Sequence, residues 1–213
     1  MIVVGISGVT NGGKTTLANA LHKAFPRSHL LCQDTYFWHK DSGHHVLIPE
    51  VNHFNWEIMS SLDMDRMWKD INNILNGEHL HRNISPNDGE PNTIQGCEVI
   101  KNVDDFEILK NVDVLIIEGF LVLNYKPIVD ICNLKYHLTL AKDECVKRRN
   151  ARTYDPPDVP GYFELCVWPE YVKHKAEMLQ TVGDVEVIDG TLGINSIFCE
   201  VVNDICEKAK HLG

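Results

Sequence analysis

Residues 8–15 have a spacing that could bind a chain of phosphates. They read Gly-Val-Thr-Asn-Gly-Gly-Lys-Thr, which fits the pattern G-x-x-x-x-G-K-[ST]. The glycines allow backbone N–H groups to turn toward phosphate oxygens, with a helix N-terminus behind them. Lys14 is expected to reach the β- and γ-phosphates, and the Thr15 hydroxyl to ligate Mg²⁺. The pattern therefore predicts a site for the phosphates of ATP, formed by Gly8, Thr10, Asn11, Gly12, Gly13, Lys14, Thr15 and Thr16.

Two carboxylates follow apolar segments that are typical of buried strands. Asp34 comes just after Ser28–Cys32, where it could orient an attacking hydroxyl or accept its proton. Glu118 ends the run Val112–Ile117, an arrangement that holds Mg²⁺ directly or through water. The simpler interpretations are a loop or capping acid for Asp34 and a solvated strand-end acid for Glu118. Beside a phosphate-binding loop we favour catalytic roles for Asp34, Lys14 and Glu118.

A basic cluster precedes a segment rich in proline and glycine. Arg148 and Arg152 are spaced i, i+4, which would place both on one face of a helix running from Asp143 to about Arg152. Residues 153–161 cannot continue that helix and predict an irregular flap. Arginines on a closing lid, here approximately 148–168, would stabilise a transferring phosphoryl group. The alternative is a solvated helix face making surface salt bridges.

A further pair of side chains suits recognition of a sugar and a ring. Trp56 offers a flat stacking surface, and Glu57 can accept hydrogen bonds from sugar hydroxyls. A loop tryptophan is also a common packing anchor, which remains the alternative interpretation.

The elements that position these residues alternate between strand and helix. We expect an α/β fold of the P-loop NTPase type, with a parallel sheet covered by helices on both faces and one domain spanning residues 1–213. Gly77–Asp105 is polar and rich in turn residues, and predicts an inserted hairpin or mobile loop. The expected strands are Met1–Ile6, Ser28–Cys32, Val112–Ile117, Tyr136–Ala141 and Val185–Ile188, and the other expected helices are Thr16–Ala24, Asp63–Leu75, Pro169–Thr181 and Ile194–Lys210.

The overall composition is that of an acidic cytoplasmic enzyme. The net charge of −10 argues against a nucleic-acid partner. Seven scattered cysteines without a C-x-x-C pair indicate reduced thiols rather than a disulfide framework, and Cys32 is expected to be a buried strand residue. No apolar run approaches the ~20 residues of a membrane span, and no signal peptide is visible. The histidines between residues 39 and 53 fit no regular metal-ligand spacing.

Taken together, these motifs closely resemble the nicotinamide riboside kinase family. The resemblance rests on Gly5–Thr16, Gln33-Asp34, Ile116–Phe120 with Asn124–Pro127, and Arg148–Phe163 with Val167–Pro169, and it covers nearly the whole chain except Gly77–Asp105. The segment Tyr-x-Pro-Pro-Asp-x-Pro-Gly-Tyr-Phe is far more specific than the phosphate-binding loop alone.

The resemblance implies roles for single residues. Asp34 matches the acid that engages the nucleoside 5′-hydroxyl, and Glu118 an acid near the metal. Trp56 and Tyr154 would enclose the cationic pyridinium ring, which favours aromatic faces on both sides. Glu57 and Arg149 would bind the ribose hydroxyls, and Arg148 and Arg152 would face the ATP phosphates. Tryptophan and glutamate at 56 and 57 depart from the tyrosine and aspartate often found there, and Thr35 stands where a second aspartate can occur.

The expected reaction is therefore transfer of the ATP γ-phosphoryl group to nicotinamide riboside, with ATP and this nucleoside as partners and Mg²⁺ as cofactor. A uridine/cytidine-type kinase is the nearest alternative, and a non-catalytic nucleotide switch is a second. An Asn-Lys-x-Asp motif that would read guanine is absent from the sequence, which disfavours the switch. The sequence does not specify the oligomeric state.

Overall fold

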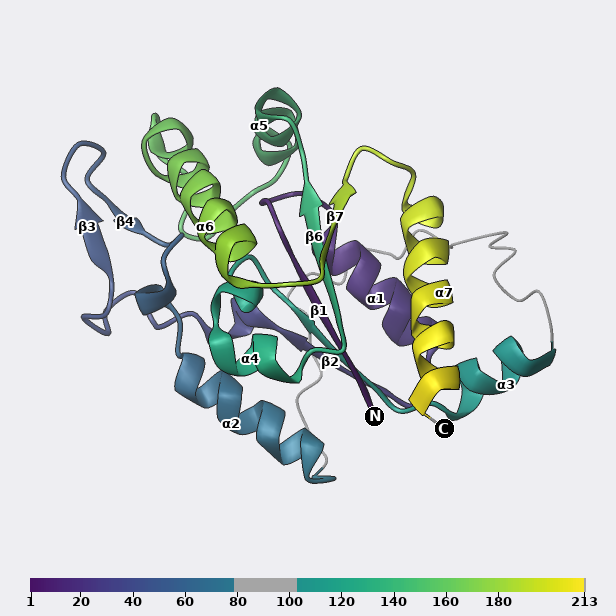
Figure 1. The fold of residues 1–213 in the computed structure, drawn as a ribbon. Helices are drawn as coiled ribbons and strands as arrows, with labels where there is room; N and C mark the ends of the chain where they lie inside the picture. The colour runs from purple at the N-terminus through teal and green to yellow at the C-terminus, as the bar shows by residue number, and fades with distance from the viewer. Residues whose placement is uncertain (79–102, 213) are drawn as a thin grey trace.

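The computed structural model describes residues 1–78 and 103–212 (Figure 1). Within these residues, five strands form a parallel sheet in the order β2-β5-β1-β6-β7. Parallel neighbours need crossover connections, and helices provide them. This architecture confirms the predicted α/β fold. The strands are β1 (Ile2–Gly8), β2 (Ser28–Cys32), β5 (Val114–Glu118), β6 (Leu134–Thr139) and β7 (Val185–Asp189).

Helices cover both faces of the sheet, as Figure 1 shows. One face packs against α1 (Lys14–Ala24), α3 (Val103–Asn111) and α7 (Ile194–Leu212); the other packs against α2 (Met64–Leu75), α4 (Lys126–Ile131) and α6 (Trp168–Thr181). Strand β1 is buried along its whole length. Its side chains alternate between the two cores: Ile2, Val4 and Ile6 join the first and Val3 the second. The central strand is therefore fixed from both sides, directly below the predicted phosphate loop.

Helix α4 was not predicted, and β6 begins at Leu134 rather than Tyr136. Three further parts of the described chain differ from the sequence-based expectation. Helix α5 (Lys142–Asn150) ends before Arg152, because the chain leaves the helical path ahead of the Pro156-Pro157 pair. Helix α3 begins at Val103, within the segment predicted as an insertion; residues 79–102 of that segment lie outside the described residues. A short antiparallel hairpin of β3 (Val46–Ile48) and β4 (His53–Asn55) was not predicted.

Within the described residues, the cysteines follow the expectation with one exception. Cys32, Cys132, Cys145 and Cys166 are buried free thiols, and Cys206 is also buried. Cys97 lies outside the described residues. Cys199 is disulfide-bonded, so the expectation of reduced cysteines throughout is wrong at this position.

Among the described helices, none combines the length and apolar character needed to cross a membrane.

Candidate active site

The phosphate-binding loop leaves β1 through backbone conformations that glycine alone adopts easily. Gly8 has a φ of +143°, and a Cβ atom there would lie 2.2 Å from the carbonyl oxygen of Leu138 on β6. Gly13 has a φ of +97° and caps the N-terminus of α1. The first turn of α1 contains no acidic residue. The positive end of the helix is thus free to bind an anion, as the sequence predicted.

Lys14, Thr15 and Glu118 meet where the loop enters α1. The Lys14 Nζ atom donates to the carbonyl oxygen of Val9 at 2.9 Å. The Thr15 hydroxyl donates to Glu118 Oε1 at 3.1 Å, although the two residues are 103 positions apart in the sequence. Glu118 is buried at the end of β5, and burial followed by the charge of Asp34 raises its pKa. A hydroxyl beside a carboxylate is an oxygen-rich donor set that suits Mg²⁺, so these residues fit the predicted metal.

Asp34 lies in the short 3₁₀ helix Gln33–Tyr36 that follows β2. Its side chain is accessible to solvent within a cleft whose walls surround it. Removal of bulk water by those walls raises the pKa of Asp34, while the charges of Lys14 and Arg152 lower it. The acid therefore faces the cationic end of the phosphate loop, where a hydroxyl could approach a phosphoryl group.

The cleft has a volume of about 1070 Å³ and collects most of the predicted site. Gly8, Gly12 and Glu118 do not line it; Glu118 lies behind Thr15. The predicted residues that do line it are Thr10, Asn11, Gly13, Lys14, Thr15, Thr16, Asp34, Trp56, Glu57, Arg148, Arg149, Arg152 and Tyr154.

Arg148 and Arg152 both reach the phosphate loop at Asn11. Arg152 Nη1 donates to Asn11 Oδ1 at 2.9 Å, and Arg148 Nη1 donates to the Asn11 carbonyl oxygen at 3.3 Å. The Asn11 Nδ2 atom also donates to the Tyr154 hydroxyl at 2.9 Å. Because α5 ends at Asn150, the prediction that Arg148 and Arg152 share one helix face is wrong. The two side chains nevertheless converge on the same loop.

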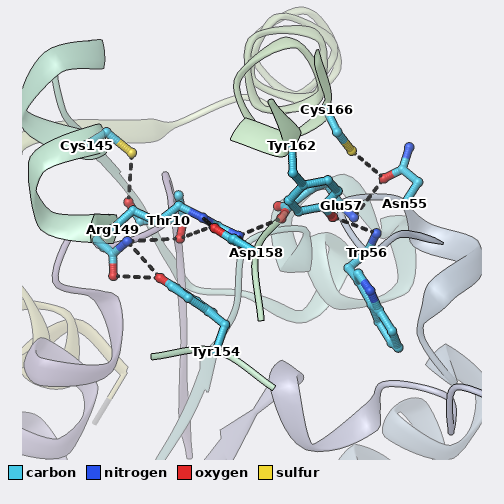
Figure 2. A network of polar contacts seen from close by, with 11 residues as sticks. Thr10, Asn55, Trp56, Glu57, Cys145, Arg149, Tyr154, Asp158, Tyr162 and Cys166 are labelled. Carbon is cyan, nitrogen blue, oxygen red and sulfur yellow. Dashed lines mark hydrogen bonds and ion pairs between the residues drawn. The ribbon is translucent and has the colours of Figure 1, made fainter. Parts of the chain in front are cut away.

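Arg149 is the centre of a buried polar network (Figure 2). Its guanidinium forms a two-point ion pair with Asp158, with Nε–Oδ2 and Nη2–Oδ1 distances of 2.5 and 2.9 Å. The same group donates to the Thr10 hydroxyl at 3.1 Å and lies 3.8 Å from Glu57 Oε1. The network joins the lid, the phosphate loop and the predicted sugar-binding acid, so Arg149 is fixed in orientation by three elements.

Burial is the main reason why Glu57 differs electrostatically from a surface acid. Burial, opposed mainly by the charge of Arg149 and assisted by the charges of Asp34 and Asp158, raises the pKa of Glu57 to about 7. Glu57 thus lies close to the point at which it gains or loses its charge near neutral pH.

Trp56 and Tyr154 line the same cleft, and in Figure 2 both rings extend to the same side of the network. Trp56 packs against Phe37 and His45, with ring centroids 5.6 and 4.1 Å away. The Arg149 guanidinium lies over the Tyr154 ring at 4.4 Å, so that face already carries a cation. The enclosure of a pyridinium ring between Trp56 and Tyr154 stays a prediction, supported by their shared cleft.

Several residues of the site were not assigned by the sequence. Phe37 and Phe120 stack at 5.9 Å on the cleft wall, and the Tyr162 hydroxyl accepts a hydrogen bond from the Trp56 backbone at 3.0 Å. Asp158 was the one with a usable signal, because it is one of two acids that closely follow Arg149 in a proline-rich segment. The aromatic residues carried no pattern that distinguishes a cleft wall from a core.

Among the described residues, no group of three or more His, Cys, Asp or Glu side chains is arranged to hold a metal ion. The Thr15–Glu118 pair is a different kind of site, because in such loops the metal also takes ligands from phosphate and water.

Comparisons with known proteins find relatives that match nearly the whole chain. The chain is 36% identical over 206 residues to nicotinamide riboside kinase 1 of Mus musculus, covering 97% of this chain and 94% of the mouse protein. It is 35% identical over 206 residues to nicotinamide riboside kinase 1 of Homo sapiens, covering 97% and 92%. A possible uridine kinase from Bacillus stearothermophilus superimposes with a TM-score of 0.47 at 14% identity, covering 87% and 88%. No family model matches the chain. On the identity and coverage of its relatives, the chain belongs to the nicotinamide riboside kinase family.

Proposed function

We propose that the protein transfers the γ-phosphoryl group of ATP to the 5′-hydroxyl of nicotinamide riboside, giving nicotinamide mononucleotide and ADP. The observation that carries this proposal is the single cleft that holds Lys14 and Thr15 together with Asp34, Glu57 and the lid. One end offers a loop for phosphates, and the other offers an acid, a sugar-binding pair and aromatic faces. Membership of the kinase family supports the same reaction.

The side chains of the cleft divide the reaction between them. Asp34 holds the 5′-hydroxyl and accepts its proton as the new oxygen–phosphorus bond forms. The bond between the γ-phosphorus and the β–γ bridging oxygen breaks, and the electron pair leaves on ADP. Lys14 stabilises charge on the transferring group, together with Arg148 and Arg152 from the lid. Mg²⁺, held by Thr15 and Glu118, would neutralise charge on the β- and γ-phosphates.

We place the nucleoside at the lid side of the cleft. Glu57 and Arg149 hold the ribose hydroxyls, and the pyridinium ring lies between Trp56 and Tyr154. We further propose that residues 1–213 act as one kinase domain with residues 148–168 as its lid, and that the protein works in the cytoplasm without a nucleic-acid partner.

A nucleoside panel assayed with ATP and Mg²⁺ tests the proposal. Nicotinamide riboside should give the highest kcat/KM, and turnover should require no second protein. Preference for uridine or cytidine would replace the proposed substrate, and absence of turnover on every nucleoside would contradict the kinase reaction itself.

Asp34→Ala tests the mechanism within the same assay. We expect kcat to fall by about 10²–10⁴-fold, the range for loss of a positioned base, with ATP binding largely retained. Asp41→Ala is the matched control, because the Asp41 side chain is 75% exposed in the loop before β3. Equal effects of the two substitutions would remove Asp34 from the reaction.

A further inference from the structure

A second, much smaller cavity adjoins the main cleft, with which it shares Thr10, Glu57 and Phe120. The centre of a water molecule can occupy about 20 Å³ of this cavity. Gly8, Thr10 and Glu57 form part of its wall. The other polar residues of the lining are Asn124, His137 of β6, and Tyr171, His174 and Lys175 of α6. The cavity thus lies between the sheet, the helix that follows the lid, and the predicted sugar-binding acid.

The polar groups that line this cavity have donors and acceptors to spare. His137 is 3% exposed, and neither of its ring nitrogens has a hydrogen-bond partner among the described residues. The same holds, within that part of the chain, for the Tyr171 hydroxyl and for His174 Nε2. His174 Nε2 lies 3.3 Å from Glu170 Oε2 but without the angles of a hydrogen bond. Buried polar atoms normally find partners, so this concentration requires an explanation.

The backbone explains why these groups face one another. His137 pairs in register with Ser7, one residue before Gly8, which brings its ring beside the base of the phosphate loop. The rings of His137 and Tyr171 are parallel to within 6°, with centroids 5.9 Å apart. Tyr171 and His174 are spaced i, i+3 on α6 and therefore present neighbouring side chains.

The chemistry of the lining selects the ligand. Burial, with the nearby charges of Lys175 and Lys14, lowers the pKa of His137 to about 3, so the ring is neutral and offers one donor and one acceptor. A tyrosine hydroxyl also offers both. The lining contains both the Glu57 carboxylate and the Lys175 ammonium, so it favours neither an anion nor a cation by charge, and a metal ion would find no cluster of three ligands among the described residues. A neutral molecule that donates and accepts equally fits best, and the volume suits one water.

We propose that this cavity is a specific water site, in which one water bridges His137, Tyr171 and His174 and thereby ties α6 to the sheet beneath the nucleoside pocket. Such a water satisfies several buried groups at once and is part of the structure rather than passing solvent. Because Glu57 lines the same cavity, the water also helps to fix the position of the Glu57 side chain.

The sign of a stability change tests the site. His137→Phe keeps the ring but removes both nitrogens. If the water is present, the substitution leaves Tyr171 and His174 short of a partner and lowers Tm by about 2–12 °C. If the cavity is dry, the same substitution removes two unsatisfied polar atoms and raises Tm, which would overturn the proposal. A high-resolution crystal structure of the unaltered protein should show a density peak within hydrogen-bond distance of at least two of the three side chains.

A double-mutant cycle separates a shared water from unrelated packing effects. Because His137 and Tyr171 would bind the same molecule, His137→Phe and Tyr171→Phe together should lower Tm by less than the sum of the single effects. Tyr125→Phe, at a half-buried tyrosine outside the cavity, is the matched control and should be additive with His137→Phe. Additivity of both pairs would rule out a common ligand.

The kinetic consequence rests on the proposed function and is measured separately. His137→Phe should raise the KM for nicotinamide riboside by about 2- to 10-fold while the KM for ATP stays unchanged. An unchanged nucleoside KM would overturn the link to Glu57. Failure of the unaltered enzyme to use nicotinamide riboside would refute the proposed function, whereas the Tm comparison would still decide whether the water site exists.

Discussion

Asp158 offers a direct test of how the lid is held, because it is the main charged partner of a nearly buried arginine. The Arg149 side chain is 7% exposed and that of Asp158 29%, and two hydrogen bonds join them. Asp158→Asn preserves the shape but replaces one acceptor by a donor and removes the charge. Hydrogen bonds to charged groups contribute about 1.5–3 kcal/mol, so we expect a loss of that size in the free energy of unfolding. For a chain of this length it corresponds to a fall in Tm of about 3–12 °C.

The chain contains a matched control for this substitution. Lys142 and Glu164 also form a short ion pair, at 2.5 Å, but their side chains are 42% and 55% exposed. Pairs in water contribute about 0–1 kcal/mol, so Glu164→Gln should change Tm little. Urea and thermal unfolding of both variants measure the contrast. Because Arg149 also contacts Thr10 and approaches Glu57, Asp158→Asn alone should raise the nucleoside KM. Equal losses of stability in the two variants would refute the argument from burial.

Three further predictions concern single side chains. Trp56→Leu keeps apolar bulk but removes the aromatic face, and should raise the KM for nicotinamide riboside by about 2- to 30-fold and the KM for uridine by less. Equal increases for the two nucleosides would show that Trp56 only packs against the ligand and does not recognise its charge. Cys32 pairs in register with Glu118, and burial followed by the charge of the nearby Glu118 carboxylate raises the pKa of the Cys32 thiol. Cys32→Ala should therefore raise the Mg²⁺ concentration needed for half-maximal rate, while Cys32→Ser restores it; identical Mg²⁺ curves would contradict this role. The pKa of Glu57 is raised from 4.5 to about 7, so its contribution to the free energy of unfolding is present below pH 4.5 and is lost as the pH rises through 7. Over the same rise in pH, the KM for the nucleoside should fall. Glu57→Gln should flatten both pH profiles, and unchanged slopes would argue against the role of Glu57 in binding the nucleoside.

The sequence predicted best where local chemistry and local backbone agree. Strand Ser28–Cys32 was predicted with its observed ends, because an apolar run stops at a polar residue that begins a new turn. The phosphate loop was predictable because each glycine meets a steric need, such as the contact between Gly8 and Leu138. The spacing of residues 8–15 therefore encodes the shape of that loop.

Prediction failed where distant or marginal contacts decide the structure. Helical spacing alone suggested that α5 continues to Arg152, yet that residue instead bonds Asn11, 141 positions away. The hairpin β3–β4 has strands of only three residues, and Val46 and Leu47 are about half exposed, so it shows no buried alternation to detect. Arg149 and Asp158 both belong to the segment Arg148–Phe163, but only the folded lid turns the two side chains toward each other.

We expect Asn11 to couple the binding of the two proposed substrates, ATP and the nucleoside. Its side chain bonds Tyr154 and Arg152 of the lid, yet it belongs to the loop that would receive the phosphates. A nucleotide that shifted this loop would therefore disturb the contacts of Arg152 and Tyr154 with Asn11. We expect Tyr154, which lines the cleft, to pass that change to the proposed nucleoside pocket. Thermodynamic linkage then requires reciprocity: whatever factor ATP applies to the affinity for the nucleoside, the nucleoside applies to the affinity for ATP, whichever of them binds first.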